Sequence, residues 1–211
     1  QTTKAPDLKA PSVSKPRALS APMMPATRSN PTNWMARHEG FVELAKKGNI
    51  DLLFLGDSIT DGWRTRGSNV WNKTYAPRKA ANFGIGGDRT EHVLWRIRSG
   101  ELDGIKPKVT VIMIGTNNSK SDKPEQVAEA IRLIIYEVQT HCPRTKVLLL
   151  AVFPRNKPTD TQEQIDNNRK VNEIIAKYDD GKRVRFLDIN KVFVGPDGKV
   201  PAEIMTDFLH P

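Results

Sequence analysis

The stretch VTVIMI, residues 109–114, is the clearest buried strand in the chain, and it runs directly into GTNN, residues 115–118. Its apolar residues are continuous instead of alternating with polar ones. That pattern is typical of a strand covered on both faces, as in the middle of a parallel sheet. The glycine and the polar residues that follow mark the point where this strand ends.

Four other short apolar runs have the length of strands, at residues 52–55, 81–83, 147–152 and 184–187. Apolar residues at helical spacing predict helices around these runs, at residues 33–48, 91–98, 124–141 and 164–178. In the first of these helices, Trp34, Phe41 and Leu44 form the expected apolar face. Alternating strands and helices predict an α/β fold of three layers, α/β/α, around a mostly parallel central sheet.

The length of 211 residues fits one domain with a tail. Residues 1–32 contain six prolines and otherwise mostly Ala, Ser, Thr and Lys, so they predict a disordered or extended leader. Residues 33–211 are expected to form the single folded domain. The first residue is Gln1, which fits processing, and the sequence leaves both an exported and a cytoplasmic location open.

Charge and composition exclude several classes of function. The net charge of +9, from 33 basic and 24 acidic residues, is scattered without a basic stripe, so we expect no nucleic-acid partner. No apolar run approaches the length of a membrane-spanning helix. A single cysteine, Cys142, and four histidines without paired spacing predict no metal site built from cysteine or histidine. The sequence indicates no particular oligomeric state.

Ligands of parallel α/β sheets bind beyond the carboxyl ends of the strands, so the residues there are candidates for chemistry. Ser58 follows the first strand and is a candidate nucleophile, although a serine at such a turn is more often a helix cap. His210 is the candidate base, and Asp207, three residues earlier, could orient its ring. The alternative is a surface turn in which the two side chains never meet.

A serine nucleophile and a histidine base fit acyl transfer, which also needs hydrogen-bond donors for the oxyanion of the tetrahedral intermediate. Gly87 can bring a backbone N–H close to a substrate, Asn117 can donate from its amide, and the N–H of Ser58 is a third donor. A plain loop glycine and an Asx turn are the alternatives for the first two. Three flanking residues are further candidates for contacting the substrate: Asp57, Trp63 and Asn118.

Four clusters carry these residues in order: GDSIT at 56–60, GIGGD at 84–88, GTNN at 115–118 and DFLH at 207–210. Together they resemble the SGNH (GDSL-type) hydrolase superfamily. The longer stretch 82–118 is similar to the branch of platelet-activating factor acetylhydrolase type Ib catalytic subunits and their bacterial relatives. The resemblance implies a flavodoxin-like sheet, a Ser58–His210–Asp207 triad, an oxyanion hole of Ser58, Gly87 and Asn117, and no metal or cofactor.

Relatives continue into a final helix after the matching histidine, whereas this chain stops at Pro211, so we expect the domain to lack that helix. The resemblance implies a serine esterase that hydrolyses short-chain, acetyl esters through a covalent acyl-enzyme. Its substrate is expected to be an acetylated carbohydrate or a small lipid. The alternative is a non-catalytic glycan-binding or scaffold module on the same fold. We expect the leader to be dispensable for hydrolysis of a small ester.

Overall fold

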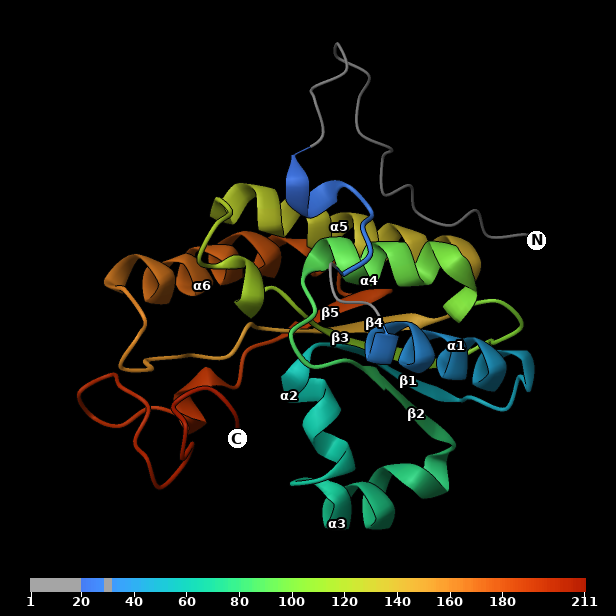
Figure 1. Ribbon diagram of the computed structural model, residues 1–211, viewed down its shortest axis with the longest axis horizontal. Helices are drawn as coiled ribbons and strands as arrows, with labels where there is room; N and C mark the ends of the chain where they lie inside the picture. Colours follow the sequence, from blue (N-terminus) through green and yellow to red (C-terminus); the bar gives the residue numbers. More distant parts are fainter. Residues whose placement is uncertain (1–19, 29–31) are drawn as a thin grey trace.

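A five-stranded sheet forms the centre of the protein (Figure 1). The computed structural model describes residues 20–28 and 32–211. The strands are β1 Leu52–Gly56, β2 Ala80–Gly84, β3 Val109–Met113, β4 Lys146–Leu150 and β5 Val184–Leu187. They lie in the order β2-β1-β3-β4-β5, and every pair is parallel. The predicted α/β fold with a parallel central sheet is therefore confirmed, and all five carboxyl ends meet at one edge.

One face of the sheet carries the main core. The register places Leu55 beside Phe83 and Ile112, and all three side chains are buried under the long helices. These helices are α1 Thr32–Lys46, α4 Thr90–Arg96, α5 Pro124–His141 and α6 Gln162–Ile175. In the part of the chain that the structure describes, no helix is apolar over a length that could cross a membrane.

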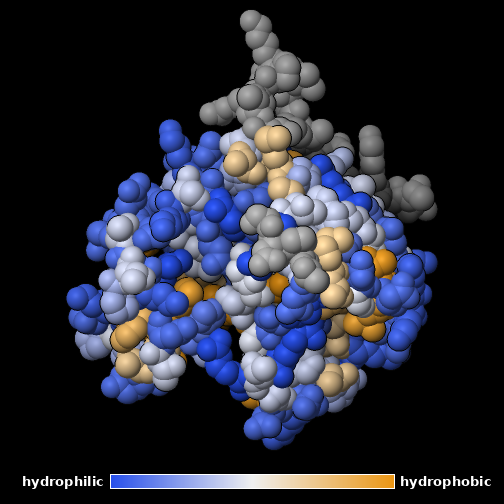
Figure 2. All heavy atoms as spheres, in the orientation of Figure 1, coloured by the Kyte–Doolittle hydropathy of each residue, from blue (hydrophilic) through white to orange (hydrophobic). Residues whose placement is uncertain are grey.

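The opposite face is covered by shorter elements: α2 Ser58–Asp61, α3 Ser68–Val70 and the turns up to Arg78. Phe54 of β1 packs there against the rings of Trp71 and Tyr75, each with a centroid separation of 5.1 Å. A cavity of about 870 Å³ lies along the rest of this face, lined by apolar side chains of β1, β3, β4 and β5. Figure 2 shows a hollow at the lower edge of the molecule, between the C-terminal loops and the α2–α3 region.

Three local expectations differ from the structure. The helix expected at residues 91–98 is α-helical only to Arg96 and continues as a π-helical turn, Ile97–Glu101, in which Gly100 adopts φ +104. Leu44 is 40 % exposed, and the smaller Ala45 takes its place in the core. The strand expected at residues 147–152 ends at Leu150, and the next two residues are buried in a loop.

Residues 20–28 lie extended across α4 and α5, with one short 3-10 turn, Ala21–Met23 (Figure 1). Pro22 is buried, and its carbonyl accepts a hydrogen bond of 3.0 Å from the Thr90 hydroxyl. The Ala26 N–H donates to the carbonyl of Glu91 over 3.2 Å. We call residues 20–28 the strap. The rest of the expected leader, except the helical Thr32, lies outside the described residues.

Candidate active site

The turn between β1 and α2 presents Ser58. The carboxylate of Asp57 caps α2 by accepting a hydrogen bond of 3.0 Å from the Ile59 N–H. Because Asp57 supplies the cap, the hydroxyl of Ser58 is free for another partner. Gly84, at the end of β2, lets the two elements approach closely: a Cβ there would lie 2.5 Å from the backbone nitrogen of Asp61.

Ser58, His210 and Asp207 form a continuous hydrogen-bonded chain. The Ser58 Oγ lies 2.8 Å from Nε2 of His210, and Nδ1 of His210 lies 2.5 Å from Oδ2 of Asp207. The other carboxylate oxygen of Asp207 accepts from the backbone N–H groups of Leu209 and His210, over 3.2 and 2.8 Å. With Nδ1 donating to the carboxylate, Nε2 can accept the serine proton, which is the arrangement of an activated nucleophile.

Hydrogen bonds from neighbouring groups keep the carboxyl group of Asp207 ionised. Burial would raise the pKa of this carboxyl, but the hydrogen bonds from the side chain and backbone of His210 outweigh it and lower the pKa to about 2. The group is therefore ionised throughout the neutral range. An anion at this position favours the imidazolium that forms when His210 takes a proton.

Three hydrogen-bond donors lie at adjacent strand ends, after β1, β2 and β3. Within the described residues, the backbone N–H groups of Ser58 and Gly87 donate to no other backbone carbonyl. The Nδ2 of Asn117 donates to the carbonyl of Asp88 over 2.8 Å. This bond fixes the amide beside the glycine loop, residues 84–88, and leaves the second amide hydrogen free. These donors could stabilise an oxyanion formed next to Ser58.

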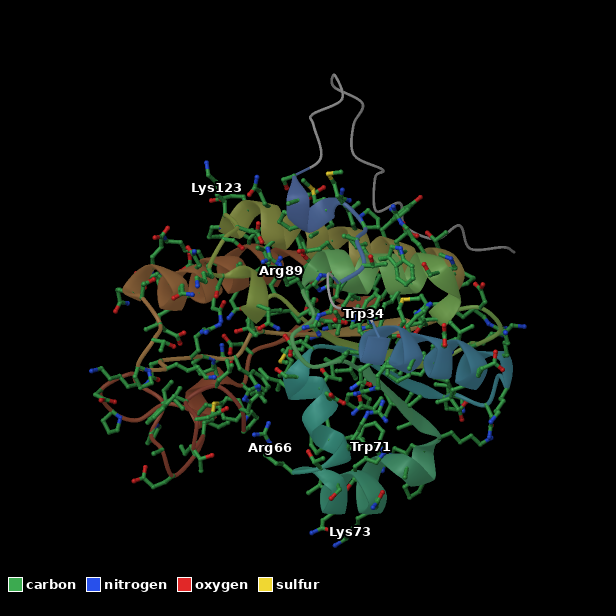
Figure 3. All side chains as sticks on the ribbon, in the orientation of Figure 1. Trp34, Arg66, Trp71, Lys73, Arg89 and Lys123 are labelled. Atoms are coloured by element: carbon green, nitrogen blue, oxygen red, sulfur yellow. The ribbon has the colours of Figure 1, made fainter. Side chains whose placement is uncertain are left out.

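A buried polar network supports the glycine loop. The carboxylate of Asp88 accepts from Nε1 of Trp34 over 2.7 Å and from Nε of Arg96 over 2.9 Å. Arg96 also pairs with Glu101, whose other oxygen lies 2.9 Å from Nδ1 of His38. Burial raises the pKa of Asp88, and the guanidinium of Arg96 opposes that shift. Trp34 stands at the start of α1, and Arg89 precedes α4 directly after the loop (Figure 3).

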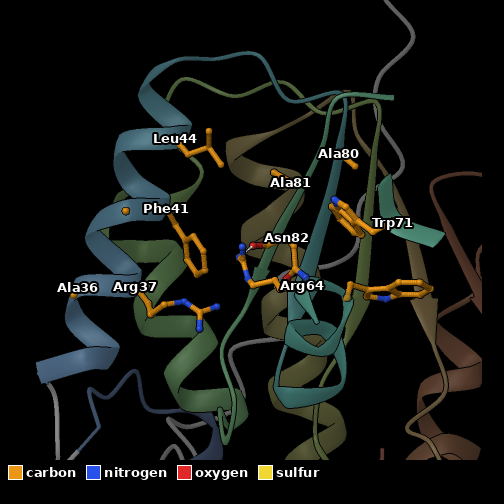
Figure 4. A pocket seen from close by; sticks show the side chains of 11 residues that line it. Ala36, Arg37, Phe41, Leu44, Arg64, Trp71, Ala80, Ala81 and Asn82 are labelled. Carbon is orange, nitrogen blue, oxygen red and sulfur yellow. Dashed lines mark hydrogen bonds between the residues drawn. The ribbon is translucent and has the colours of Figure 1, made fainter. Parts of the chain in front are cut away.

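A second set of arginines braces α2. Asp61 of that helix pairs with Arg37 over 2.7 Å and with Arg64 over 3.1 Å. Arg37 also donates to the carbonyl of Gly84, and Arg64 donates to the carbonyl of Asn82, both on the edge strand β2. Figure 4 shows the two arginines pointing into a groove of about 400 Å³ between α1 and β2. They tie the helix that carries Ser58 to the sheet.

The remaining sequence candidates lie in different settings. Asp57 is wholly buried, burial raises its pKa to about 7, and its Oδ2 has no partner within the described residues. Asn118 is also wholly buried, and its Oδ1 accepts from the Thr90 N–H. Neither side chain reaches the surface where a substrate would bind. Trp63 is half-buried and lines both the groove and the large cavity.

His92 lies in α4, where its Nδ1 accepts a hydrogen bond of 3.0 Å from the Arg89 N–H. Burial lowers the pKa of His92 to about 4, so the ring is neutral.

In the described part of the chain, no three His, Cys, Asp or Glu side chains gather as a set that could hold a metal ion.

Two arginines at the site were not anticipated from the sequence. Arg155 pairs with Asp160 over 2.5 Å and donates to the carbonyl of Thr116 over 3.0 Å, next to Asn117. Arg28 of the strap donates to the carbonyl of Gly86 over 2.7 Å. Neither belongs to a recognisable motif, and both bind backbone carbonyls of loops that are distant in sequence.

Comparison with known proteins places the chain in a family. The sequence model described as the GDSL-like Lipase/Acylhydrolase family matches residues 54–211. Platelet-activating factor acetylhydrolase IB subunit alpha2 of Rattus norvegicus is 39 % identical over 178 residues, which is 84 % of this chain and 76 % of that protein. Subunit alpha1 of Bos taurus is 36 % identical over 201 residues, covering 91 % of this chain and 84 % of that protein.

Solved structures share the fold. A GDSL-like lipase from Bacteroides thetaiotaomicron superimposes with a TM-score of 0.67 at 21 % identity, covering 85 % of this chain and 89 % of that one. Axe2, an acetylxylan esterase from Geobacillus stearothermophilus, superimposes with a TM-score of 0.57 at 19 % identity, covering 76 % and 85 % of the two chains.

Proposed function

The chain belongs to the GDSL-like lipase/acylhydrolase family and is a carboxylic ester hydrolase, and we propose that it is a serine esterase specific for short acyl groups, above all acetyl. The observation that carries this proposal is the chain of hydrogen bonds from the Ser58 hydroxyl through His210 to Asp207. The distance of 2.8 Å between the Ser58 Oγ and Nε2 of His210 is short enough for proton transfer as the hydroxyl attacks.

The reaction proceeds in two halves. Nε2 of His210 takes the proton of Ser58 while Oγ attacks the ester carbonyl, and the oxyanion lies against the donors of Ser58, Gly87 and Asn117. The imidazolium returns its proton to the leaving alcohol, and an acyl-enzyme remains on Ser58. Water then attacks the acyl carbonyl with His210 again as base, which releases the acid and restores the serine.

The preference for acetyl rests on similarity. The relatives with more than a third of their residues identical are called platelet-activating factor acetylhydrolase subunits, and one structural neighbour is called an acetylxylan esterase. We propose that the alcohol part is a carbohydrate or a small lipid. Trp63 is our candidate to contact it, since this half-buried ring lines the large cavity together with His210.

The large cavity favours a second candidate, hydrolysis of esters with longer acyl chains. His210 contributes to its lining together with the apolar side chains of Ile59, Phe153 and Phe193. A volume of about 870 Å³ is large enough for a medium-chain acyl group. The two candidates differ in how the rate depends on the length of the acyl chain.

A panel of esters separates these candidates. We expect p-nitrophenyl acetate and acetylated sugars to be hydrolysed with higher kcat/KM than p-nitrophenyl octanoate, with Ser58→Ala as the blank. A higher value for octanoate would favour the second candidate. Wild-type turnover no greater than that of Ser58→Ala on every ester would overturn the proposed function itself.

A further inference from the structure

The guanidinium of Arg28 holds the peptide that joins Gly86 to Gly87. Its Nη1 donates to the carbonyl of Gly86 over 2.7 Å. The same peptide unit carries the N–H of Gly87, which is a donor of the proposed oxyanion hole. Because a trans peptide is planar, its C=O and N–H point in opposite directions. Arg28 therefore binds this peptide on the side opposite to the Gly87 N–H, which points toward the proposed oxyanion hole.

The peptide lies at the centre of a turn that can flip. The Asp88 N–H donates to the carbonyl of Ile85 over 3.1 Å, and Gly87 has φ +79, as the third residue of a type II turn does. Type I and type II turns differ in the orientation of this central peptide. With glycine at both central positions, side chains block neither orientation. A flip would turn the Gly86 carbonyl, an acceptor, toward the oxyanion.

We infer that Arg28 is a positioning residue for catalysis: it keeps the Gly86–Gly87 peptide in the orientation that aims the Gly87 N–H at the oxyanion. A flip would break the charge-assisted hydrogen bond to the Gly86 carbonyl. The bond also polarises the peptide, which makes its N–H a stronger donor. This inference rests on the proposed function, because the orientation matters only if an acyl group reacts at Ser58.

The strap holds Arg28 in place. The bonds from the Thr90 hydroxyl to Pro22 and from the Ala26 N–H to Glu91 fix the strap to α4, which begins just after the glycine loop. Nη2 of Arg28 lies 3.0 Å from the point that a Cβ on Gly87 would occupy. The guanidinium thus covers the loop as well as bonding to it.

Arg28 lies outside residues 54–211, so the family match assigns it no role. The inference replaces the expectation that the whole leader is dispensable for hydrolysis of a small ester. Removal of residues 1–30 takes Arg28 away, and we now expect that deletion to lower kcat as Arg28→Ala does.

The test compares Arg28→Ala with Arg183→Ala in the full chain. Arg183 makes a bond of the same kind and length, 2.7 Å from Nη2 to the carbonyl of Pro143, but at the amino ends of β4 and β5. For Arg28→Ala we expect kcat on p-nitrophenyl acetate to fall about tenfold, with KM nearly unchanged. This loss is smaller than the loss of about 10²–10³ in kcat that removal of a whole oxyanion donor typically causes. Arg183→Ala is expected to keep the wild-type kcat.

Chemical rescue distinguishes positioning from a structural role. Millimolar guanidinium is expected to restore part of the kcat of Arg28→Ala, whereas urea at the same concentration is not. An unchanged kcat in Arg28→Ala would overturn the inference. A loss of kcat that accompanies a lower Tm and resists guanidinium would overturn it as well.

Phosphonylation of Ser58 by a p-nitrophenyl phosphonate, followed by mass spectrometry, separates this inference from the proposed function. Its transition state also places negative charge in the oxyanion hole. If Ser58 of the wild type does not react, the proposed function fails and the inference with it. If wild type and Arg28→Ala react at equal rates, the inference alone fails. We expect slower reaction of Arg28→Ala.

Discussion

The two halves of the candidate site are built in different ways. The nucleophile and the oxyanion donors follow β1, β2 and β3, which are neighbours in the sheet, and buried ionic contacts such as Asp88–Arg96 hold their loops. Asp207 and His210 lie instead in a C-terminal stretch of turns, where Phe208 adopts the left-handed φ of +57. Local hydrogen bonds to the Asp207 carboxylate set the geometry there.

The two halves are expected to respond differently to substitution. Substitutions in the oxyanion half are expected to affect stability and catalysis together, since its polar groups are part of the core. Substitutions of Asp207 and His210 are expected to change catalysis with little effect on stability, because both residues are only half-buried, whereas Val200 and Met205 anchor that stretch in the core. The following substitutions test this contrast, beginning with the largest effect.

Removal of the base should have the largest effect. For His210→Ala we expect kcat to fall on the order of 10⁴-fold or more, because no other described side chain lies within hydrogen-bonding distance of the Ser58 hydroxyl. The Tm should stay near that of the wild type, since the histidine closes a surface turn. Steady-state kinetics and thermal unfolding measure the two effects. A large fall in Tm would contradict the contrast between the halves.

Arg96→Met tests the oxyanion half. Arg96 is wholly buried with Asp88 and Glu101, and methionine would leave both carboxyl groups without their cation. We expect the free energy of unfolding to fall by about 3–5 kcal/mol, measured in urea. The control is Arg169→Met, which removes an exposed pair with Glu173 and should cost less than about 1 kcal/mol. Equal losses for the two variants would contradict the role of the buried network.

Asn156→Ala tests what holds the C-terminal stretch. The Oδ1 of Asn156 accepts from the Val200 N–H over 2.7 Å, and its backbone N–H donates to the carbonyl of Phe208 over 3.2 Å. Alanine removes the first bond and keeps the second. We expect the free energy of unfolding to fall by about 1–2 kcal/mol and kcat to fall by less than about tenfold. Asn156→Asp keeps the acceptor and should lose less. Identical losses in both variants would count against this role.

A separate prediction concerns the pH dependence of stability. Burial raises the pKa of Asp57 from 3.8 to about 7, so the folded protein keeps this proton while the unfolded chain releases it near pH 4. The contribution of Asp57 to stability is therefore present at low pH and is lost as the pH rises toward 7. Asp57→Asn retains the helix cap without the titration.

We expect the Tm of Asp57→Asn, relative to that of the wild type, to rise between about pH 5 and about pH 8. Differential scanning calorimetry at several pH values gives this difference. A difference that does not vary with pH would show that Asp57 is ionised in the folded state throughout.

The sequence predicted the five strands and their positions along the chain, because continuous apolar runs followed by glycine and polar residues are a strong local signal. It did not predict the turns from Gly62 to Arg78, since these short 3-10 and π-helical pieces have no periodic apolar face. It placed Leu44 in the core, but the structure buries the neighbouring Ala45 instead. Tertiary packing decides such positions.

The residues expected to act at the site lie together at one sheet edge, and the motif spacing was enough to nominate them. Their supporting residues were not predictable. Arg28, Arg96 and Arg155 each bind a group that is near only in the folded chain, and a lone arginine in a sequence does not reveal its partner. Burial removed Asp57 and Asn118 from the substrate surface, and the sequence carried no sign of that.

The most direct test of the account is to trap the covalent intermediate. Wild-type protein mixed with an excess of p-nitrophenyl acetate, quenched in acid during the first turnover and digested, is examined by mass spectrometry. We expect an acetyl group on the hydroxyl of Ser58, absent from Ser58→Ala. Turnover with no acyl group on Ser58 at any time, or with the acyl group on another residue, would contradict it.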